Sequence, residues 1–360
     1  MGEEKEITGK LIGRKWRKGD FSAKVGAALQ DKVYLSKEQR INLKDSFKSS
    51  IWRLEMTSRK QTYPVILKIF KTLTRTESWI ELNMYQNGAA VFDGLLPEIY
   101  FIEPEVSGDS CWVAMEYVRP LKEQVKLTPG QFANIIPSLA EMHSRTFQDR
   151  YQSWQSLFEG WLPIYEGDAL QSERMVTREK AGAMLEEAMQ REDLKEKLSE
   201  SYPTLVKLLE RGPIYFPELI EAGQCIVHSD LQTTNMGCNQ IGQSSWDIRF
   251  TDWEGAKYAP CWFDMVNLVG VFLAYRKEWR GQEEQIVKEC AILYAKEMKK
   301  RGIAFRLDPV KLYKMAYLQR ILEKSLYLQL HWSVNEIKNA VLLDGYLEKV
   351  NKWGKELELL

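Results

Sequence analysis

Four polar side chains in the second half of the sequence have types and spacing suited to chemistry on phosphate groups. His228, Asp230 and Asn235 form the pattern H-x-D-x-x-x-x-N, and Asp252 follows at the end of a second apolar segment. A carboxylate can accept the proton of an attacking hydroxyl, and carboxylate and amide oxygens are ligands of Mg²⁺. Because phosphoryl transfer mainly needs positioning and charge neutralisation, such a set suits it. We therefore expect Asp230 to be the base, Asn235 and Asp252 to hold the metal ion, and His228 to brace the loop.

An alternative interpretation of these residues requires no chemistry. A buried, hydrogen-bonded His228 with Asp230 and Asn235 as turn residues of a hairpin would give the same pattern. Several other chemistries lack their usual signatures, because the sequence contains no G-x-x-x-x-G-K-[ST], G-x-G-x-x-G, H-E-x-x-H or G-x-S-x-G. P-loop, dinucleotide-binding, zincin and nucleophile-elbow proteins are therefore not expected.

The elements that must position these residues change in type along the chain. Apolar alternation and turn residues predict strands and one helix in the first third, at 50–56, 64–70, 76–87 (the helix), 98–103 and 110–117. After Pro120 helical periodicity prevails, at 130–146, 174–192, 202–211, 282–301, 309–331 and 333–359. A short β-like stretch at 224–253 interrupts the helices. We predict an α+β protein with a β-rich lobe at 1–118 and a mostly helical lobe at 119–360.

Length and composition indicate a soluble protein of two domains. The chain has 360 residues, 44% of them hydrophobic, and its 50 basic and 50 acidic side chains give no net charge. A dedicated nucleic-acid binder would be strongly basic, so no nucleic-acid partner is expected. The 5 cysteines form no C-x-x-C pair, and the charged start has no apolar segment. We expect reduced thiols, a cytoplasmic location and no membrane association; the oligomeric state stays open.

The segment from Ile226 to Asn235 resembles the catalytic loop of the aminoglycoside phosphotransferase and choline kinase branch of the protein-kinase-like superfamily, which usually reads His-Gly-Asp-Leu-His-x-x-Asn. The segment 252–256, with Pro260 and Asp264, resembles the metal-binding segment of that family, and 139–143 resembles the helix before its substrate region. These matches occur in the family's order over most of the chain. The resemblance implies a two-lobed protein-kinase-like fold, with a small nucleotide-binding lobe and a larger catalytic and substrate-binding lobe.

The resemblance also implies a lysine that holds the nucleotide phosphates. Lys68, in the predicted strand 64–70, matches the strand lysine of the family, and Glu81 best matches its partner on the following helix. Glu77 lies one turn earlier on the same helix face and is the alternative partner. If Lys68 instead lies at a sheet edge and faces water, it needs no partner.

Nucleotide contacts elsewhere in the first lobe follow the family less closely. The family's phosphate loop falls at 45–50, which contains no glycine, so Ser49 and Ser50 are the candidates for phosphate contacts. The interlobe hinge falls at Glu116 to Val118, where backbone groups would contact adenine. In the catalytic loop two residues depart from the family pattern, Ser229 for glycine and Gln232 for the second histidine.

The acceptor is the least specified part of the site. Aromatic and acidic side chains after the helix at 130–146 and after the metal segment suit an amine-bearing or cationic molecule, and we select Trp161, Glu254 and Asp264 as candidate substrate residues. The alternative is that the aromatic residues belong to the core and the acidic ones to a solvated surface.

These observations predict a small-molecule kinase that transfers the γ-phosphoryl group of ATP or GTP, with Mg²⁺, to a hydroxyl group of a small and amine-bearing acceptor. The alternative is a non-catalytic relative, such as a spore-coat-type structural or nucleotide-binding protein, which the glycine-free phosphate loop favours. A protein kinase is disfavoured because the sequence lacks the D-F-G and A-P-E motifs of an activation segment.

Overall fold

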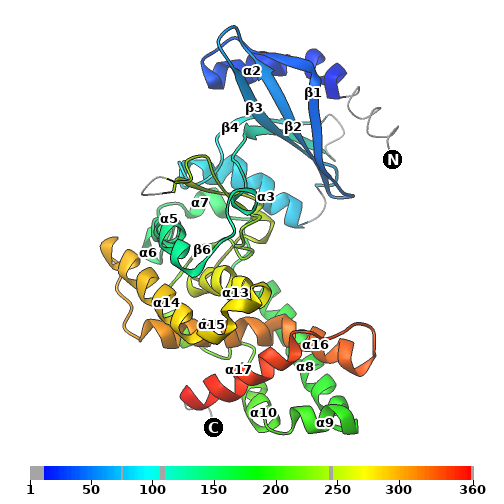
Figure 1. Cartoon of the computed structure of the whole chain (residues 1–360), viewed down its shortest axis with the longest axis vertical. Coiled ribbons are helices and arrows are strands. Elements are labelled where there is room, and N and C mark those ends of the chain that lie inside the picture. Colours follow the sequence, from blue (N-terminus) through cyan, green and yellow to red (C-terminus); the bar gives the residue numbers. More distant parts are fainter. Residues whose placement is uncertain (1–11, 74–75, 106–109, 243–245, 358–360) are drawn as a thin grey trace. The chain divides into compact units, whose positions relative to one another are not determined.

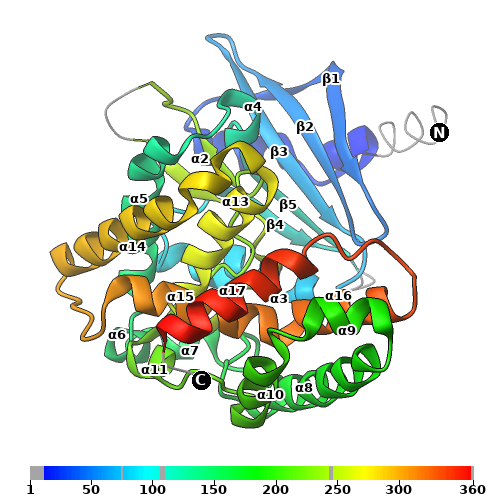
Figure 2. The ribbon, with the colours of Figure 1, turned by 60° about the horizontal axis from the view of Figure 1, so that its bottom comes forward.

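The computed structural model describes residues 12–73, 76–105, 110–242 and 246–357, and its ribbon is shown in Figures 1 and 2. The chain forms two compact units. Unit 1 comprises residues 1–126, 157–161 and 233–255, and unit 2 comprises 127–156, 162–232 and 256–360. The first lobe was expected to end at residue 118, whereas unit 1 extends to 126 and also includes the later segment 233–255. The chain therefore passes from unit 2 back to unit 1 between Gln232 and Thr233.

Unit 1 is built on an antiparallel five-stranded sheet with the order β1-β2-β3-β5-β4. Its strands are β1 (Tyr34–Asp45), β2 (Ser49–Thr57), β3 (Thr62–Phe70), β4 (Ile99–Pro104) and β5 (Cys111–Glu116). The four predicted strands of this region are confirmed, and β1 is an additional edge strand. Lys68 pairs with Ile51 of β2 and with Val113 of β5. It therefore lies on the central strand and not at a sheet edge.

The two faces of this sheet carry different side chains because successive residues of a strand point in opposite directions. One face buries Trp52, Leu54 and Leu67 against helical residues 12–18 and α2 (Phe21–Leu29), to which Trp16 and Phe21 belong. Figure 1 shows α2 against the blue strands of the sheet. Lys68 follows Leu67 and so points to the other face, where α3 (Thr76–Asn87), the predicted helix, supplies its partner.

A small hairpin, β7 (Met236–Cys238) with β8 (Ile248–Phe250), completes unit 1. Gly237 forms a bridge with Pro120, and the N–H of Phe250 donates to the carbonyl of Leu95. A Cβ atom on Gly237 would lie 2.6 Å from Val118, so only glycine allows the hairpin to approach this closely. These bonds explain why residues 233–255 group with the amino-terminal sheet.

Unit 2 is mostly helical and contains one two-stranded ladder, β6 (Gln224–Val227) with β9 (Lys257–Pro260). Its longer helices are α5 (Phe132–Arg145), α8 (Asp168–Met189), α10 (Tyr202–Arg211), α14 (Glu283–Lys300), α15 (Pro309–Arg320), α16 (Leu326–Val334) and α17 (Leu343–Glu356). Figure 2 shows α17 beside α15, and the two helices are in contact. The helix predicted at 309–331 contains a π turn at Ile321–Ser325, and the one predicted at 333–359 begins only at Leu343.

Short elements connect these parts. The short helices are α4 (Leu121–Gln124), α6 (Asp149–Gln152), α7 (Gln155–Phe158), α9 (Glu192–Leu198), α11 (Glu218–Glu221), α12 (Trp262–Met265) and α13 (Val271–Tyr275), and a π turn, Val266–Gly270, joins the last two. Every helix in the described part of the chain is too short or too polar to span a membrane.

Candidate active site

The strand lysine of unit 1 forms a buried ion pair. Lys68 Nζ lies 2.5 Å from both carboxylate oxygens of Glu81, and the two residues are only 6% and 2% exposed. Burial disfavours the ammonium, but attraction to Glu81 and Asp252 outweighs burial and raises the pKa of Lys68 above its usual value. Glu77 is exposed on the preceding turn of α3. The structure therefore pairs Lys68 with Glu81, as the family pattern implies.

Two further residues connect this pair to the end of the β7–β8 hairpin. Lys68 Nζ also donates to Asp252 Oδ1 at 3.1 Å. The hydroxyl of Tyr85, one turn after Glu81 on α3, donates to Glu81 Oε1 at 2.7 Å and accepts from the N–H of Asp252 at 3.4 Å. Lys68, Glu81, Tyr85 and Asp252 thus form a closed ring of hydrogen bonds. Tyr85 had not been expected in the site, and its only sequence signal is its i+4 spacing from Glu81.

Asn235 and Asp252 come from the two ends of this hairpin. Met236 pairs with Phe250, and the N–H of Thr251 donates to the carbonyl of Asn235 at 2.9 Å, so Asn235 lies beside the residue that precedes Asp252. Asp252 has a φ of 64°, which places its side chain at a sharp left-handed bend. Among the described residues no group of three His, Cys, Asp or Glu side chains could hold a metal ion. One carboxylate and one amide oxygen fit Mg²⁺, which usually takes one or two protein ligands plus phosphates and water.

The glycine-free phosphate loop is a tight turn between β1 and β2. The Ser46 hydroxyl donates to the carbonyl of Ser49 and accepts from the N–H of Ser49, at 3.0 and 3.1 Å. Ser49 and Ser50 are both buried at the start of β2. Lys48, at the tip of the turn, forms an ion pair of 3.2 Å with Glu254. Lys71 Nζ also donates to the carbonyl of Ser46 at 2.8 Å, so two lysines lie at this turn. Sequence reasoning missed both because it considered only backbone and hydroxyl contacts.

The hinge segment of unit 1 is attached to the β7–β8 hairpin. The N–H of Glu116 donates to the carbonyl of Glu98, and the Glu116 carboxylate accepts from the Asn239 amide at 3.3 Å. Val118 is 9% exposed and lies against Gly237. The side chains of Glu116 and Val118 thus hold the hinge in place, and backbone contact with adenine stays a prediction.

The loop that bears the predicted base begins in unit 2. His228 is fully buried, and its Nδ1 accepts from the N–H of Asp230 at 3.4 Å, so it braces the loop as predicted. Asp230 itself is exposed. The side-chain amide of Gln232, which replaces the second histidine of the family, donates to both Asp230 oxygens at 3.1 and 3.3 Å. This arrangement presents a carboxylate in a fixed orientation.

Asp264 anchors this loop to the helices of unit 2. Its fully buried carboxylate accepts from the N–H groups of His228 and Ser229, both at 2.7 Å, and from Nε2 of His143 on α5 at 3.1 Å. Burial opposes ionisation, but the bond from His143 and the nearby His228 outweigh it and lower the pKa of Asp264. Ser229 has a φ of 67°, which explains why the family usually has glycine here.

Each of the three candidate substrate residues has partners within its own unit. Asp264 has no exposed surface and positions the catalytic loop. Glu254 is engaged by Lys48. Trp161 donates from Nε1 to the carbonyl of Leu157 and contacts the Phe158 ring at 5.5 Å. Each of these side chains is therefore engaged by neighbouring residues of the protein.

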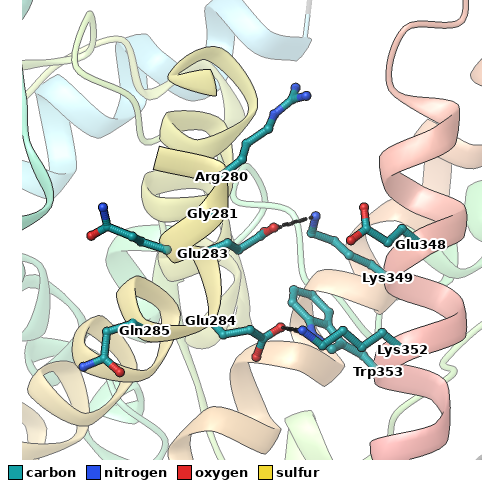
Figure 3. A pocket seen from close by; sticks show the side chains of 10 residues that line it. Arg280, Gly281, Glu283, Glu284, Gln285, Glu348, Lys349, Lys352 and Trp353 are labelled. Atoms are coloured by element: carbon teal, nitrogen blue, oxygen red, sulfur yellow. Dashed lines mark hydrogen bonds and ion pairs between the residues drawn. The ribbon is translucent and has the colours of Figure 1, made fainter. Parts of the chain in front are cut away.

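A separate pocket of about 440 Å³ lies in unit 2 between the start of α14 and α17, and Figure 3 shows the side chains that line it. Its charged groups neutralise one another. Glu283 pairs with Lys349 at 3.1 Å and Glu284 with Lys352 at 2.9 Å. None of the predicted site residues lines this pocket, and its charge balance gives no indication of a ligand.

Comparisons with known proteins find relatives by structure but not by sequence. No protein-family model and no curated protein matches the chain. A GDP complex of a variant of aminoglycoside 2′-phosphotransferase-IIIa matches with a TM-score of 0.51 at 11% identity, over 94% of this chain and 97% of that one. The chain has a protein-kinase-like fold. The resemblance seen in the sequence is thus confirmed at the level of the fold.

Two further solved structures have lower scores. Spectinomycin phosphotransferase in complex with ADP and spectinomycin matches with a TM-score of 0.49 at 13% identity, over 89% of this chain and 93% of that one. An ethanolamine kinase from Plasmodium vivax matches with a TM-score of 0.47 at 14% identity, over 89% and 82%.

The buried ion pair leads to a prediction about stability. Lys68→Met leaves the Glu81 carboxylate buried beside Asp252 without a cation, so we expect the free energy of unfolding to fall by about 3–5 kcal/mol. Lys71→Met is the matched control, since Lys71 forms an exposed pair with Asp45 and should contribute at most about 1 kcal/mol. Urea unfolding measures both. Equal losses in the two variants would show that the Lys68 pair is not a buried charge pair.

The anchor of the catalytic loop leads to a second prediction. Asp264→Ala leaves two backbone N–H groups without their acceptor, so we expect a loss of about 3 kcal/mol or more. Because the folded pKa is lowered, the contribution of Asp264 is complete above about pH 4 and is lost as the pH falls through the folded pKa. Ser229→Gly, in the same loop, should instead be neutral or stabilise by about 1 kcal/mol. Urea unfolding at pH 7 and at acidic pH tests this, and a pH-independent loss in Asp264→Ala would contradict it.

Proposed function

We propose that this protein is a small-molecule kinase that transfers the γ-phosphoryl group of ATP or GTP to a hydroxyl group. The observation that carries the proposal is the ring of Lys68, Glu81, Tyr85 and Asp252. It holds the ammonium of Lys68 and the carboxylate of Asp252 3.1 Å apart in unit 1. Burying a lysine costs desolvation free energy, so buried lysines are rare in proteins. An ammonium and a metal-binding carboxylate at this spacing suit a nucleotide phosphate chain and its cation.

Two further features support a nucleotide donor. Asn235 and Asp252 provide hard oxygen atoms from adjacent ends of one hairpin, and Mg²⁺ bound there would shield the charge of the phosphates. A structural neighbour with a TM-score of 0.51 is a GDP complex. Thermal melts with each nucleotide distinguish ATP from GTP as the donor.

The proposed reaction needs one base on the protein. Asp230 accepts the proton of the acceptor hydroxyl while the oxygen of that hydroxyl forms a bond to the γ-phosphorus. The bond from that phosphorus to the β,γ-bridging oxygen breaks, and the nucleoside diphosphate leaves. Gln232 orients the Asp230 carboxylate, and Asp264 fixes the backbone of the preceding residue. Chain continuity keeps Asp230 five residues before the metal ligand Asn235.

The first test separates nucleotide binding from chemistry. Mg-ATP or Mg-GTP at about a hundred times its dissociation constant stabilises the folded state by about 2.7 kcal/mol, so the melting midpoint should rise by a few degrees. Asp252→Ala should abolish the shift. Asp247→Ala is the matched control, because Asp247 is an exposed carboxylate just before β8, and this variant should keep the shift.

Asp230→Asn should bind the nucleotide with an unchanged shift yet lose acceptor-dependent release of the diphosphate by about 10²–10⁴-fold. Absence of a shift with either nucleotide would reject the kinase and favour the non-catalytic structural alternative. A shift that survives Asp252→Ala would place the nucleotide elsewhere. Phosphorylation of casein or peptides in preference to small alcohols would instead indicate a protein kinase.

A further inference from the structure

Lys257 is a half-buried lysine at the start of the β6–β9 ladder of unit 2. It pairs in register with Val227, the residue before His228, so its backbone lies beside the start of the catalytic loop. Within the described part of the chain, no carboxylate lies within ion-pair distance of its ammonium. Lysine is rarely buried without such a partner. Lys68, in contrast, has two carboxylate partners. The position of Lys257 therefore needs an explanation.

A second cation contacts the same loop. Arg320, the last residue of α15, donates from Nη2 to the carbonyl of Ser229 at 3.4 Å and to Asn267 Oδ1 at 3.3 Å. Its guanidinium lies 5.3 Å from the centre of the Phe263 ring, and its side chain is 23% exposed. Arg320 therefore lies next to the residue that precedes Asp230, and part of its side chain is open to solvent.

The surrounding carboxylates neutralise this pair of cations only in part. Burial lowers the pKa of Lys257 to about 8; repulsion from Arg320 and Arg174 lowers it further, while Glu323 and Glu173 oppose the shift. Glu323 Oε2 lies 4.0 Å from Nη1 of Arg320, and Glu323 Oε1 accepts from the Tyr165 hydroxyl and the Gln319 amide. Glu173 is exposed on α8. An incoming anion would thus meet cations that lack sufficient counter-charge.

We propose that the acceptor carries an oxyanion, a carboxylate or a phosphate, next to the hydroxyl that it presents to Asp230, and that Lys257 and Arg320 hold this oxyanion. A guanidinium fork with an ammonium point charge is a donor set suited to such groups. The inference rests on the proposed kinase function for the hydroxyl and specifies the substrate class. It differs from the cationic acceptor expected from Trp161 and Glu254, which these two cations would repel.

Four probes that share a three-carbon vicinal diol test the charge preference. Glycerate carries a carboxylate, glycerol 3-phosphate a phosphate, 3-amino-1,2-propanediol an ammonium, and glycerol no charge. Thermal melts at millimolar probe concentration should show a raised midpoint with at least one anionic probe and none with glycerol or the amine. The two anionic probes distinguish a carboxylate site from a phosphate site. A shift with the amine equal to that with the anions, or no shift with either anion, would overturn the proposal.

Variants locate the binding site. Lys257→Met and Arg320→Met should each weaken the binding of the anionic probe by about 10- to 100-fold, the range for a hydrogen bond to a charged group. Lys257→Arg should retain much of the affinity. Lys299→Met, the same change on the last turn of α14, should leave binding unchanged. Retention of full affinity in Lys257→Met would also overturn the proposal.

Lys257→Met is expected to be more stable than the parent at neutral pH, because it removes a half-buried charge that has no ion-pair partner among the described residues. The folded pKa of Lys257, about 8, lies below the unfolded value of about 10.4, so the parent gains stability as the pH rises between them. The advantage of Lys257→Met in urea unfolding should therefore shrink from pH 7 to pH 10. A variant that is less stable at pH 7 would show that Lys257 is held by structural partners and is no ligand site.

Failure of the kinase proposal would look different. Loss of the Mg-nucleotide shift with retention of a Lys257-dependent anion shift would reject phosphoryl transfer but support an oxyanion site. A normal nucleotide shift without an anion shift would keep the kinase and reject the acidic acceptor.

Discussion

The buried ammonium of Lys68 is the constraint on which the rest of unit 1 depends. Removing a lysine from water costs several kcal/mol, and the cost is recovered only if carboxylates and hydrogen bonds surround the charge. Glu81 can reach Lys68 only because β3 is the central strand and α3 crosses the face on which Lys68 points. Asp252 can reach it only because the β7–β8 hairpin is fixed to residues 95 and 120. One charge therefore determines where Glu81, Tyr85 and Asp252 lie.

Unit 2 also contains a buried charge that is compensated by its neighbours, but this charge is negative. Asp264 is a buried carboxylate, and its compensation comes from two loop N–H groups and from His143. Because these N–H groups belong to His228 and Ser229, satisfying the charge also fixes the backbone before Asp230. A left-handed Ser229 is the conformational cost of this arrangement. Each unit thus uses one buried charge to hold one part of the chemistry in place.

The sequence predicted what local patterns can encode. Period-two alternation placed the strands that hold Lys68, and the spacing of His228, Asp230 and Asn235 located the loop. The edge strand β1 was missed because YLSKEQRINLKD is mostly polar and its pairing with β2 is interrupted by register shifts. Asp264 was taken for a substrate residue because its acceptor role depends on a contact with residues 35 and 36 positions away. Partners so distant in sequence have no local signature.

Lys257 shows the limit of sequence patterns most clearly, because in the sequence it is an ordinary lysine beside Tyr258. Its proximity to the loop at residues 228–230 becomes apparent only in the structure. There, Lys257 pairs with Val227 in the β6–β9 ladder, and Arg320 at the end of α15 contacts Ser229. Lys68 and Asp264 are compensated by direct partners, whereas among the described residues no carboxylate lies within ion-pair distance of Lys257 and the nearby Glu323 and Glu173 compensate it only in part. In the proposed oxyanion site, the ligand supplies the remaining negative charge next to the loop that contains Asp230.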